Sequence, residues 1–375
     1  MSCLRAAEFF AGIGLMRLGL EAAGVRTVWA NDIEPGKRDM YVSNFGEDEY
    51  VLSDVRDVAG DSLPDVEIAT ASFPCTDLSL AGNRRGLGVR AAPRGENGGS
   101  SMFWEFARVL YEMGSRRPTV VLLENVLGFA SSHGGRDLRG AVMELNALGY
   151  SCDLLMIDAR HFVPQSRPRM FIVGLVDPPT EYDTMGFTER PVWVREFASR
   201  TPSAQLHAKR LPQLPTGATS LARVVERLSP DAPEWWGPER VSRFVDSLSS
   251  IQAERLEALR QAPKLVWRTA YRRTRNGVAV WEIRRDGISG CLRTARGGSS
   301  KQALVEAGRG EVRVRWMTPR EYARLMGADR FSLTARPNQA LFGFGDAVCV
   351  PVIEWLCAHY VVPAASASTP PLVAA

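Results

Sequence analysis

Histidine and cysteine are scarce in this chain, which has four histidines and six cysteines among 375 residues. No two cysteines form a Cys-x-x-Cys pair and the histidines lack metal-ligand spacing, so neither a zinc ribbon nor a redox dithiol is indicated, and no metal is expected. So few cysteines in so long a chain also argue against a disulfide framework. Cys75 is therefore expected to carry a free thiol.

Long apolar runs are missing as well. No stretch of about 18 apolar residues could span a bilayer, and Met1-Ser2-Cys3-Leu4-Arg5 leads directly into a predicted strand, with no basic-then-apolar signal segment. With 45% hydrophobic and 23% charged residues, the composition is typical of a soluble globular protein with more than one domain. These features predict a cytoplasmic protein without a membrane partner.

Charge is unevenly distributed along the chain, although the net charge is only +4. Residues 190–330 contain 27 Lys and Arg, 24 of them Arg, against 14 Asp and Glu, whereas the remainder contains 19 against 28. Solvated helix faces would give such a bias, and so would a surface that contacts a polyanion. The arginine excess favours a polyanion, because guanidinium groups suit phosphates and guanine edges.

Residues 1–177 alternate short apolar strands with amphipathic helices, which is typical of an α/β, doubly wound, mostly parallel sheet. Strands are predicted near 4–10, 25–31, 66–72, 118–123, 152–157 and 169–175, and helices near 14–23, after Pro35, and near 101–114 and 136–148.

The alternation stops after Asp177, where prolines become frequent, so residues 178–314 are predicted to form a smaller, irregular domain. Thr318-Pro319-Arg320-Glu321 has the form of a capping box and predicts a helix to about Met326. With a last helix near 348–360, residues 315–362 are expected to return to the first domain. Residues 363–375 are expected to be a disordered tail.

The first strand leads into Phe9-Phe10-Ala11-Gly12-Ile13-Gly14, which resembles a nucleotide-binding turn. Gly12 and Gly14 let a ligand approach the N-terminus of a helix, and Asp32, 20 residues after Gly12, is placed to accept hydrogen bonds from a ribose. An ordinary tight turn has the same pattern. Arg17 replaces the third glycine of the dinucleotide pattern, which favours a cofactor without a pyrophosphate.

Two reactive side chains follow neighbouring predicted strands: Cys75 in Phe73-Pro74-Cys75, and Glu124 in Glu124-Asn125-Val126. Because the carboxyl ends of parallel strands meet at one edge, this thiol and carboxyl group can act as nucleophile and acid on one small ring. A free cysteine is commonly a small buried hydrophobe. The Phe-Pro-Cys turn instead fixes the backbone and directs the thiol outward. Burial is expected to raise the pKa of Glu124 and suit it to donate a proton or hydrogen bond.

Two basic segments are further candidates for the functional site. In Gln165-Ser166-Arg167-Pro168-Arg169 the two arginines would share one face of a strand and could clamp a phosphate or order Glu124, unless the segment is a solvated edge. The glycine- and arginine-rich segment 80–100 could close over a substrate or be a plain connection.

Together these segments resemble the DNA (cytosine-5)-methyltransferase family of bacterial modification enzymes. They occur in the order of the family, and Thr318-Pro319-Arg320-Glu321 and Gly345-Asp346-Ala347-Val348 extend the match over nearly the whole chain. Thr76, Asp346 and Leu15 stand where the family usually has Gln, Asn and Gly. These three departures remove no bond-making group, so an active enzyme is expected.

The resemblance implies S-adenosylmethionine as methyl donor, double-stranded DNA as partner, a target-recognition role for the basic middle segment, and a cognate restriction or other defence system. A monomer is expected. By analogy, Cys75 attacks C6 of a flipped-out cytosine while Glu124 acts at N3. The implied catalytic residues are Cys75, Glu124, Arg167 and Arg169; those that bind the cofactor are Phe10, Gly12, Gly14, Asp32, Ile33, Asp54, Val55, Pro74 and Asp346; those that bind the substrate are Ser79, Arg84, Asn125 and Gln165.

Two alternative functions stay open at this point. A tRNA-directed offshoot of the family shares these segments, but the basic middle of the chain favours a reader of duplex DNA. A catalytically silent DNA-binding protein is the other alternative, and intact Cys75 and Glu124 argue against it.

Overall fold

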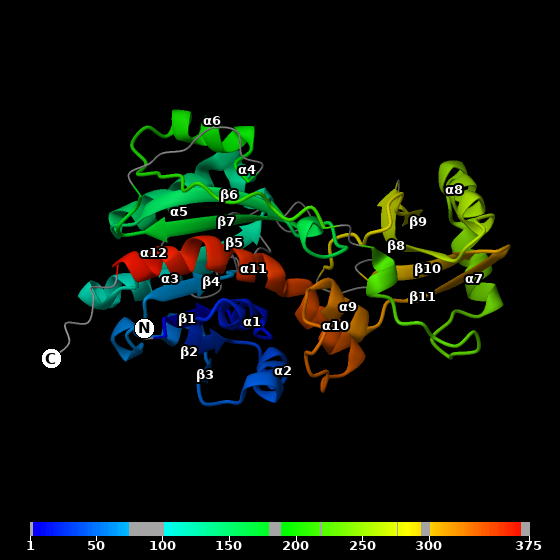
Figure 1. Cartoon of the computed structure of the whole chain (residues 1–375), viewed down its shortest axis with the longest axis horizontal. Helices are drawn as coiled ribbons and strands as arrows, with labels where there is room; N and C mark the ends of the chain where they lie inside the picture. Colours follow the sequence, from blue (N-terminus) through cyan, green and yellow to red (C-terminus); the bar gives the residue numbers. More distant parts are fainter. Residues whose placement is uncertain are drawn as a thin grey trace. The chain divides into compact units, whose positions relative to one another are not determined.

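The computed structural model describes residues 3–74, 101–179, 189–217, 220–275, 277–293 and 301–368. The chain forms two compact units (Figure 1). The first unit comprises Met1–Asp158, Pro168–Gln213 and Val350–Ala375, and the second comprises Ala159–Arg167 and Leu214–Cys349.

The first unit is built on a seven-stranded sheet in the order β3-β2-β1-β4-β5-β7-β6 (Figure 1). Its strands are β1 Arg5–Phe9, β2 Arg26–Asp32, β3 Tyr50–Leu52, β4 Ile68–Ala71, β5 Val120–Val126, β6 Ser151–Asp158 and β7 Pro168–Leu175. All neighbours pair in parallel except β7, which is antiparallel to both β5 and β6. The predicted doubly wound, mostly parallel sheet is confirmed.

Helices cover both faces of this sheet. They are α1 Leu15–Ala22, α2 Pro35–Phe45, α3 Met102–Glu112, α4 Gly128–Ser131, α5 Arg136–Ala147, α6 Val192–Arg200, α11 Val350–Leu356 and α12 Val362–Ser368. On one face, α3 and α5 bury a large apolar cluster, in which the Phe9 and Phe106 rings meet edge to face at 5.0 Å. On the other face α1 packs so closely on α11 that a Cβ at Gly19 would lie 2.5 Å from that of Ile353.

The predicted strands that correspond to β1, β2 and β4–β7 and the predicted helices that correspond to α1, α3 and α5 lie within three residues of the observed bounds, and α2 begins at Pro35 as expected. The sequence analysis did not predict α4 or α6. The segment after Pro363 differs from expectation, because α12 continues to Ser368 and buries Ala365. A π-helical turn, Cys357–Val361, joins α11 to α12 and precedes Pro363, which has no N–H to donate to the helix. The remaining tail lies outside the described residues.

The second unit contains a four-stranded antiparallel sheet in the order β11-β10-β8-β9, which the sequence did not predict. Its strands are β8 Val266–Arg275, β9 Val278–Ile283, β10 Ala303–Gly308 and β11 Glu311–Trp316, and its helices are α7 Pro238–Asp246, α8 Ser250–Arg260, α9 Pro319–Leu325 and α10 Pro337–Asp346. Arginines fill one end of β8, so its apolar alternation is weak. The predicted capping box at Thr318 and Glu321 is confirmed.

One apolar helical stretch in the described part of the chain, Pro337–Ser368, is long enough to be considered for a membrane span. Its most apolar window is 72% buried, and residues 347–349 interrupt the helix between α10 and α11. Burial of this kind is typical of a helix in the core of a soluble protein.

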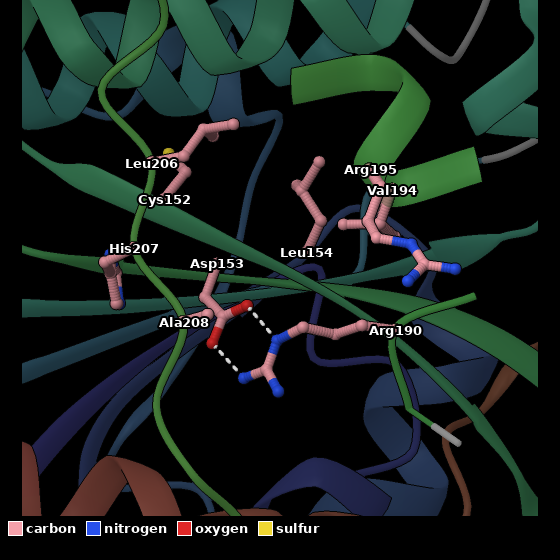
Figure 2. Close-up of a pocket in the computed structure, with 9 residues that line it drawn as sticks. All are labelled: Cys152, Asp153, Leu154, Arg190, Val194, Arg195, Leu206, His207 and Ala208. Atoms are coloured by element: carbon pink, nitrogen blue, oxygen red, sulfur yellow. Dashed lines mark hydrogen bonds and ion pairs between the residues drawn. The ribbon is translucent and has the colours of Figure 1, made fainter. Parts of the chain in front are cut away.

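A buried polar network ties the C-terminal helix to edge strand β6, and Figure 2 shows the Asp153, Arg190 and His207 side chains of this network beside a pocket. Asp153 accepts hydrogen bonds from Arg190 Nε at 2.8 Å and Nη2 at 2.6 Å, and from the Tyr360 hydroxyl at 2.8 Å. His207 Nε2 lies 2.8 Å from the same hydroxyl, and its Nδ1 lies 3.0 Å from Ser151 Oγ. Because the Tyr360 proton goes to Asp153, the network assigns the proton of a neutral His207 to Nε2. A small pocket opens beside this network, and none of the expected site residues that the structure describes lines it.

Acid is expected to destabilise the first unit through His207. Burial lowers the pKa of His207 from 6.5 to about 4. Between pH 6.5 and pH 4, His207 is therefore protonated in the unfolded chain and neutral in the folded chain. Stability attributable to His207 is therefore complete above pH 6.5 and falls by up to about 3 kcal/mol as the pH drops towards 4. Urea unfolding followed from pH 7 to pH 4 should show a shallower fall in His207→Gln than in the unchanged protein.

The matched control is His359→Gln, at an exposed position on the same helical segment. This variant should keep the original pH dependence. An identical dependence in His207→Gln would contradict the assignment.

Candidate functional site

The glycine-rich turn lies at the carboxyl end of β1, beside the end of β2. The Asp32 carboxylate accepts hydrogen bonds from Gly12 N and Glu34 N, both at 2.9 Å, so it shapes the turn as well as facing it. Phe10 has a φ of +58°, a strained value for a residue with a side chain, and Gly12 has the same φ. Strain of this kind clusters at ligand sites.

The two glycines of the turn differ in their surroundings. Among the described residues, the atom nearest to a Cβ at Gly12 would be Lys37 Cδ at 3.9 Å, which leaves room for a ligand. A Cβ at Gly14 would lie 2.4 Å from the Phe45 ring and 2.8 Å from Tyr41. Gly14 is therefore needed for packing against α2.

The next expected cofactor residues lie after β2 and β3. Ile33 follows Asp32 directly, and its side chain is 60% exposed. Asp54 caps a short 3₁₀ turn, Val55–Asp57, and its carboxylate holds Arg56 through Nε at 3.0 Å and Nη2 at 2.6 Å. Val55 is buried in the core beneath. The turn after β1 and the residues after β2 and β3 thus share one edge of the sheet.

Glu124 lies in β5 and is only 7% exposed. Arg169 Nε on the antiparallel strand β7 lies 3.0 Å from Glu124 Oε1 and compensates its buried charge. The register pairs Glu124 with Phe171 and Val126 with Arg169, so the two charged side chains are diagonal neighbours on one face. The expectation that Arg169 orders Glu124 agrees with this geometry.

Asn125 supports the segment that leads to Cys75. Its Nδ2 donates a 3.1 Å hydrogen bond to the Phe73 carbonyl, and its Oδ1 accepts one from Val126 N at 2.8 Å. The amide thus fixes the backbone two residues before Cys75, and Pro74 is exposed just after it. Cys75, Ser79, Arg84 and the rest of segment 80–100 lie outside the described residues.

Gln165 and Arg167 both lie in the second unit and hold backbone there. Gln165 Nε2 donates to the Leu325 carbonyl at 2.8 Å, and its Oε1 accepts from Leu292 N at 3.1 Å. Arg167 Nη2 donates to the carbonyls on both sides of Asp346, Gly345 at 3.2 Å and Ala347 at 2.6 Å. Arg167 thus binds backbone within the second unit, whereas Arg169 lies beside Glu124 in the first unit.

Glu8 is a site candidate that the sequence analysis missed. It lies in β1 between Ala30 and Thr70 of the neighbouring strands, is 1% exposed, and makes no hydrogen bond of normal geometry with the described residues. Burial, partly offset by Arg17, raises its pKa from 4.5 to about 8. The signal was visible: an acid inside an apolar strand, two residues before the strained turn, as with Glu124.

The strand order with its reversed seventh strand, the glycine-rich turn and the acid after β2 define a methyltransferase of the doubly wound class. Residues 4–360 match the C-5 cytosine-specific DNA methylase family, and the chain belongs to this family. It is a DNA (cytosine-5)-methyltransferase.

Individual relatives agree with this placement. The chain is 26% identical over 355 residues to the Type II methyltransferase M.HhaI of Haemophilus parahaemolyticus, covering 94% of this chain and 93% of that protein. It is 28% identical over 357 residues to the Type II methyltransferase M.NlaX of Neisseria lactamica, covering 92% and 93%. Its fold is similar to that of the S. pombe Dnmt2 methyltransferase, with a TM-score of 0.61 at 16% identity, over 96% of this chain and 99% of the other.

Alkaline pH is expected to destabilise the protein through Glu8. An unfolded Glu8 ionises near 4.5 and the folded one near 8, so stability is complete below pH 4.5 and is lost as the pH rises through 8. Glu8→Gln removes this loss and should raise the free energy of unfolding at pH 8.5 by about 2–4 kcal/mol, with little effect at pH 4.5. Urea unfolding at both pH values measures the difference.

Glu34→Gln, at an exposed position, serves as control and should change neither value. If Glu8→Gln lowers stability at pH 8.5, Glu8 is ionised and paired in the folded protein.

Proposed function

We propose that the first unit transfers a methyl group from S-adenosylmethionine to C5 of a flipped-out cytosine in duplex DNA, with Cys75 as the covalent nucleophile. The observation that carries this proposal is the Glu124–Arg169 pair on β5 and β7, beside the Asn125 amide that fixes the backbone leading to Cys75. Family membership makes DNA the substrate. The roles of individual residues are argued from the geometry.

The residues around the glycine-rich turn fit S-adenosylmethionine. The space above Gly12, the Asp32 carboxylate beside it and the exposed Ile33 side chain would suit a ribose and an adenine ring. Phe10, Asp54 and Val55 would complete the adenine contacts, and Gly14 supports them by packing. When bound, the cofactor supplies an activated methyl group on its sulfonium. We propose Pro74 and Asp346 as further contacts.

The protein's own groups carry the remaining chemistry. The Cys75 thiolate bonds to C6 of the cytosine, while Glu124 stabilises the ring by a hydrogen bond or proton at N3. Electron density at C5 then accepts the methyl group. Loss of the C5 proton expels Cys75 and restores the aromatic ring. Arg169 acts by holding the Glu124 carboxylate in place.

Gln165 and Arg167 then act as positioning residues. Because their polar atoms already bind backbone groups of the second unit, we propose that they shape the segments around Leu292 and Asp346 for the DNA or the cofactor. Ser79 and Arg84 are proposed to contact the substrate directly.

We propose that residues 178–314 supply the target-recognition domain, whose compact part begins at Leu214, and that the return to the catalytic domain within residues 315–362 is made from Val350. The arginine excess of the middle segment supports this. So do the exposed Arg272, Arg273 and Arg275 of β8, and the Arg240 guanidinium stacked 4.0 Å above the Trp236 ring. Arginine presented on strands and aromatic rings suits phosphates and base edges. We further propose a cytoplasmic monomer that works with a cognate restriction or other defence system, since the relatives are named as Type II methyltransferases.

Removing either proposed catalytic group should stop or slow methylation. Cys75→Ser is expected to abolish both methyl transfer and the stable adduct with duplex DNA that contains 5-fluorocytosine, because the nucleophile is lost. Glu124→Gln should slow turnover by a factor on the order of 10² or more, as expected for a positioned acid. Methyl transfer to duplex DNA and adduct formation on denaturing gels provide the measurements.

The control for both variants is calorimetric S-adenosylmethionine binding, which should stay near that of the unchanged protein. Near-normal turnover by Cys75→Ser would overturn the covalent mechanism. A loss of only a few fold in Glu124→Gln would make Glu124 structural. Efficient transfer to tRNA but not to duplex DNA would overturn the choice of substrate.

Exchange of residues 178–314 with the matching segment of a relative should move the methylated sequence. The product should remain 5-methylcytosine, because the catalytic residues lie outside the exchanged segment. Bisulfite sequencing of DNA from cells that express the chimera reads product and target site together. An active chimera that keeps the original target would show that specificity lies elsewhere, for example in segment 80–100.

A further inference from the structure

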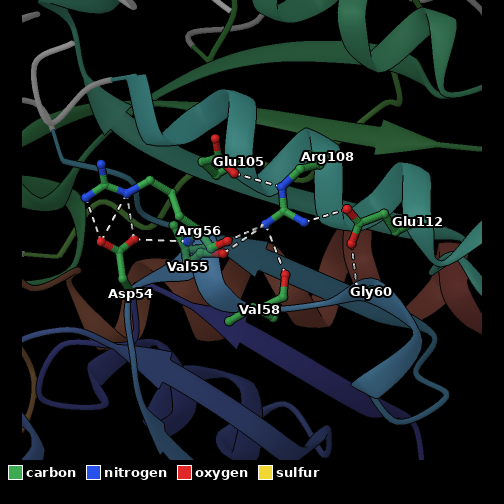
Figure 3. Close-up of polar contacts among 8 residues, drawn as sticks. All are labelled: Asp54, Val55, Arg56, Val58, Gly60, Glu105, Arg108 and Glu112. Carbon is green, nitrogen blue, oxygen red and sulfur yellow. Dashed lines mark hydrogen bonds and ion pairs between the residues drawn. The ribbon is translucent and has the colours of Figure 1, made fainter. Parts of the chain in front are cut away.

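We infer that Arg108, on α3, is a positioning residue that holds the cofactor-binding turn after β3 in place for the adenine (Figure 3). This inference rests on the proposed function, because it takes Asp54 and Val55 as cofactor contacts. In the described part of the chain, the hydrogen bonds of the Arg108 side chain go to backbone carbonyls of this turn and to two acids on its own helix. Its role would be exerted through the backbone alone.

The Arg108 guanidinium is committed to the turn on one side. Its Nη2 donates to the carbonyls of Val55 at 3.1 Å and Val58 at 3.0 Å, and reaches that of Arg56 at 3.5 Å. Three carbonyls that converge on one planar group fix the path of the backbone more tightly than a single hydrogen bond would. Figure 3 shows them pointing towards Arg108 from the short 3₁₀ turn and the residue after it.

Two acids on the same helix hold Arg108 in this orientation. Glu105 Oε2 accepts from Arg108 Nε at 2.7 Å, and Glu112 Oε1 accepts from Nη1 at 2.6 Å. The spacings of three and four residues place all three side chains on one face of α3. The other carboxylate oxygen of Glu112 accepts a hydrogen bond from Gly60 N at 2.9 Å. The same face of α3 therefore also binds the backbone just beyond the turn.

The backbone at Gly60 packs closely against α3. A Cβ at Gly60 would lie 2.5 Å from the Val109 carbonyl and 2.6 Å from Glu112 Cβ. Val55 and Val58 are buried in the core on the inner side of the turn. Hydrogen bonds from Arg108 and apolar packing of Val55 and Val58 therefore act together to hold the turn against α3.

Asp54 links the turn that Arg108 holds to the proposed cofactor site. Its Oδ1 accepts from the Arg56 backbone N–H at 3.0 Å, and the carboxylate also receives the Arg56 side chain. The direction of Asp54 thus depends on where residues 55–58 lie. A small shift of their carbonyls away from α3 would move the carboxylate relative to the adenine, and misplacements of about 1 Å can cost large factors in binding or rate.

Arg116 offers a matched control. It also donates to carbonyls of the same connection, Leu63 at 2.9 Å and Gly60 at 3.2 Å, and pairs with Asp65. These carbonyls lie beyond the turn, however, so Arg116 does not hold residues 55–58. Loss of Arg116 should therefore cost stability without moving Asp54.

The test compares Arg108→Ala, Arg108→Lys and Arg116→Ala in the full-length protein. We expect Arg108→Ala to raise the dissociation constant and KM for S-adenosylmethionine about tenfold, while kcat and KM for DNA change by less than about threefold. Arg108→Lys keeps one donor and the charge, and should fall between. Arg116→Ala should lower the melting temperature but leave S-adenosylmethionine binding within about twofold. Should Arg108→Ala fail to fold, Arg108→Lys carries the test, with the same direction expected.

Equal effects of Arg108→Ala and Arg116→Ala on cofactor binding, or no effect of either Arg108 variant, would overturn the inference. Asp54→Asn and Asp32→Ala, measured beside them, separate its failure from that of the proposed function. If both aspartate variants bind S-adenosylmethionine normally, the proposed cofactor site is wrong. If they bind it weakly and the Arg108 variants bind it normally, only the positioning role is wrong.

Discussion

The insertion of β7, reversed, between β5 and β6 is the constraint on which the proposed catalytic centre depends. Antiparallel pairing sets Phe171 opposite Glu124, and this register brings Arg169 onto the face that carries the carboxylate. A slip of one residue would turn Arg169 to the other face and leave a charge buried at 7% exposure without its partner. The reversed strand thus makes an acid tolerable inside an apolar sheet.

Much of the polar chemistry near the site serves the backbone. Asn125 holds the Phe73 carbonyl, Gln165 holds that of Leu325, and Arg167 holds the carbonyls that flank Asp346. Each of these side chains satisfies main-chain groups that no strand or helix pairs, and so fixes irregular segments that regular structure cannot fix. A site built on loops needs such supports, because its reactive groups are only as well placed as the chain that carries them.

Two buried titratable groups show the cost of polar residues in the first unit. His207 is kept neutral within a hydrogen-bonded network. The Glu8 carboxylate is instead buried near the strained turn and makes no hydrogen bond of normal geometry with the described residues. Their shifted pKa values act in opposite directions, since one group resists taking up a proton and the other resists losing it. His207 belongs to a network that ties the C-terminal helix to β6. Within the described residues, the Glu8 carboxylate has no comparable hydrogen-bonded partner.

The sequence by itself determined the α/β class, most strands and helices of the first 177 residues, the capping box at Thr318, and the family, because periodicity and short motifs are local properties of the chain. Only the tertiary structure decided that Arg167 and Arg169 bind different partners, that Arg108 reaches the carbonyls of Val55 and Val58, and that the second unit contains a four-stranded sheet. These depend on which carbonyls and charges, distant in sequence, come within hydrogen-bond reach. Spacing along the chain cannot reveal that, since the partners are chosen by the folding of the backbone around them.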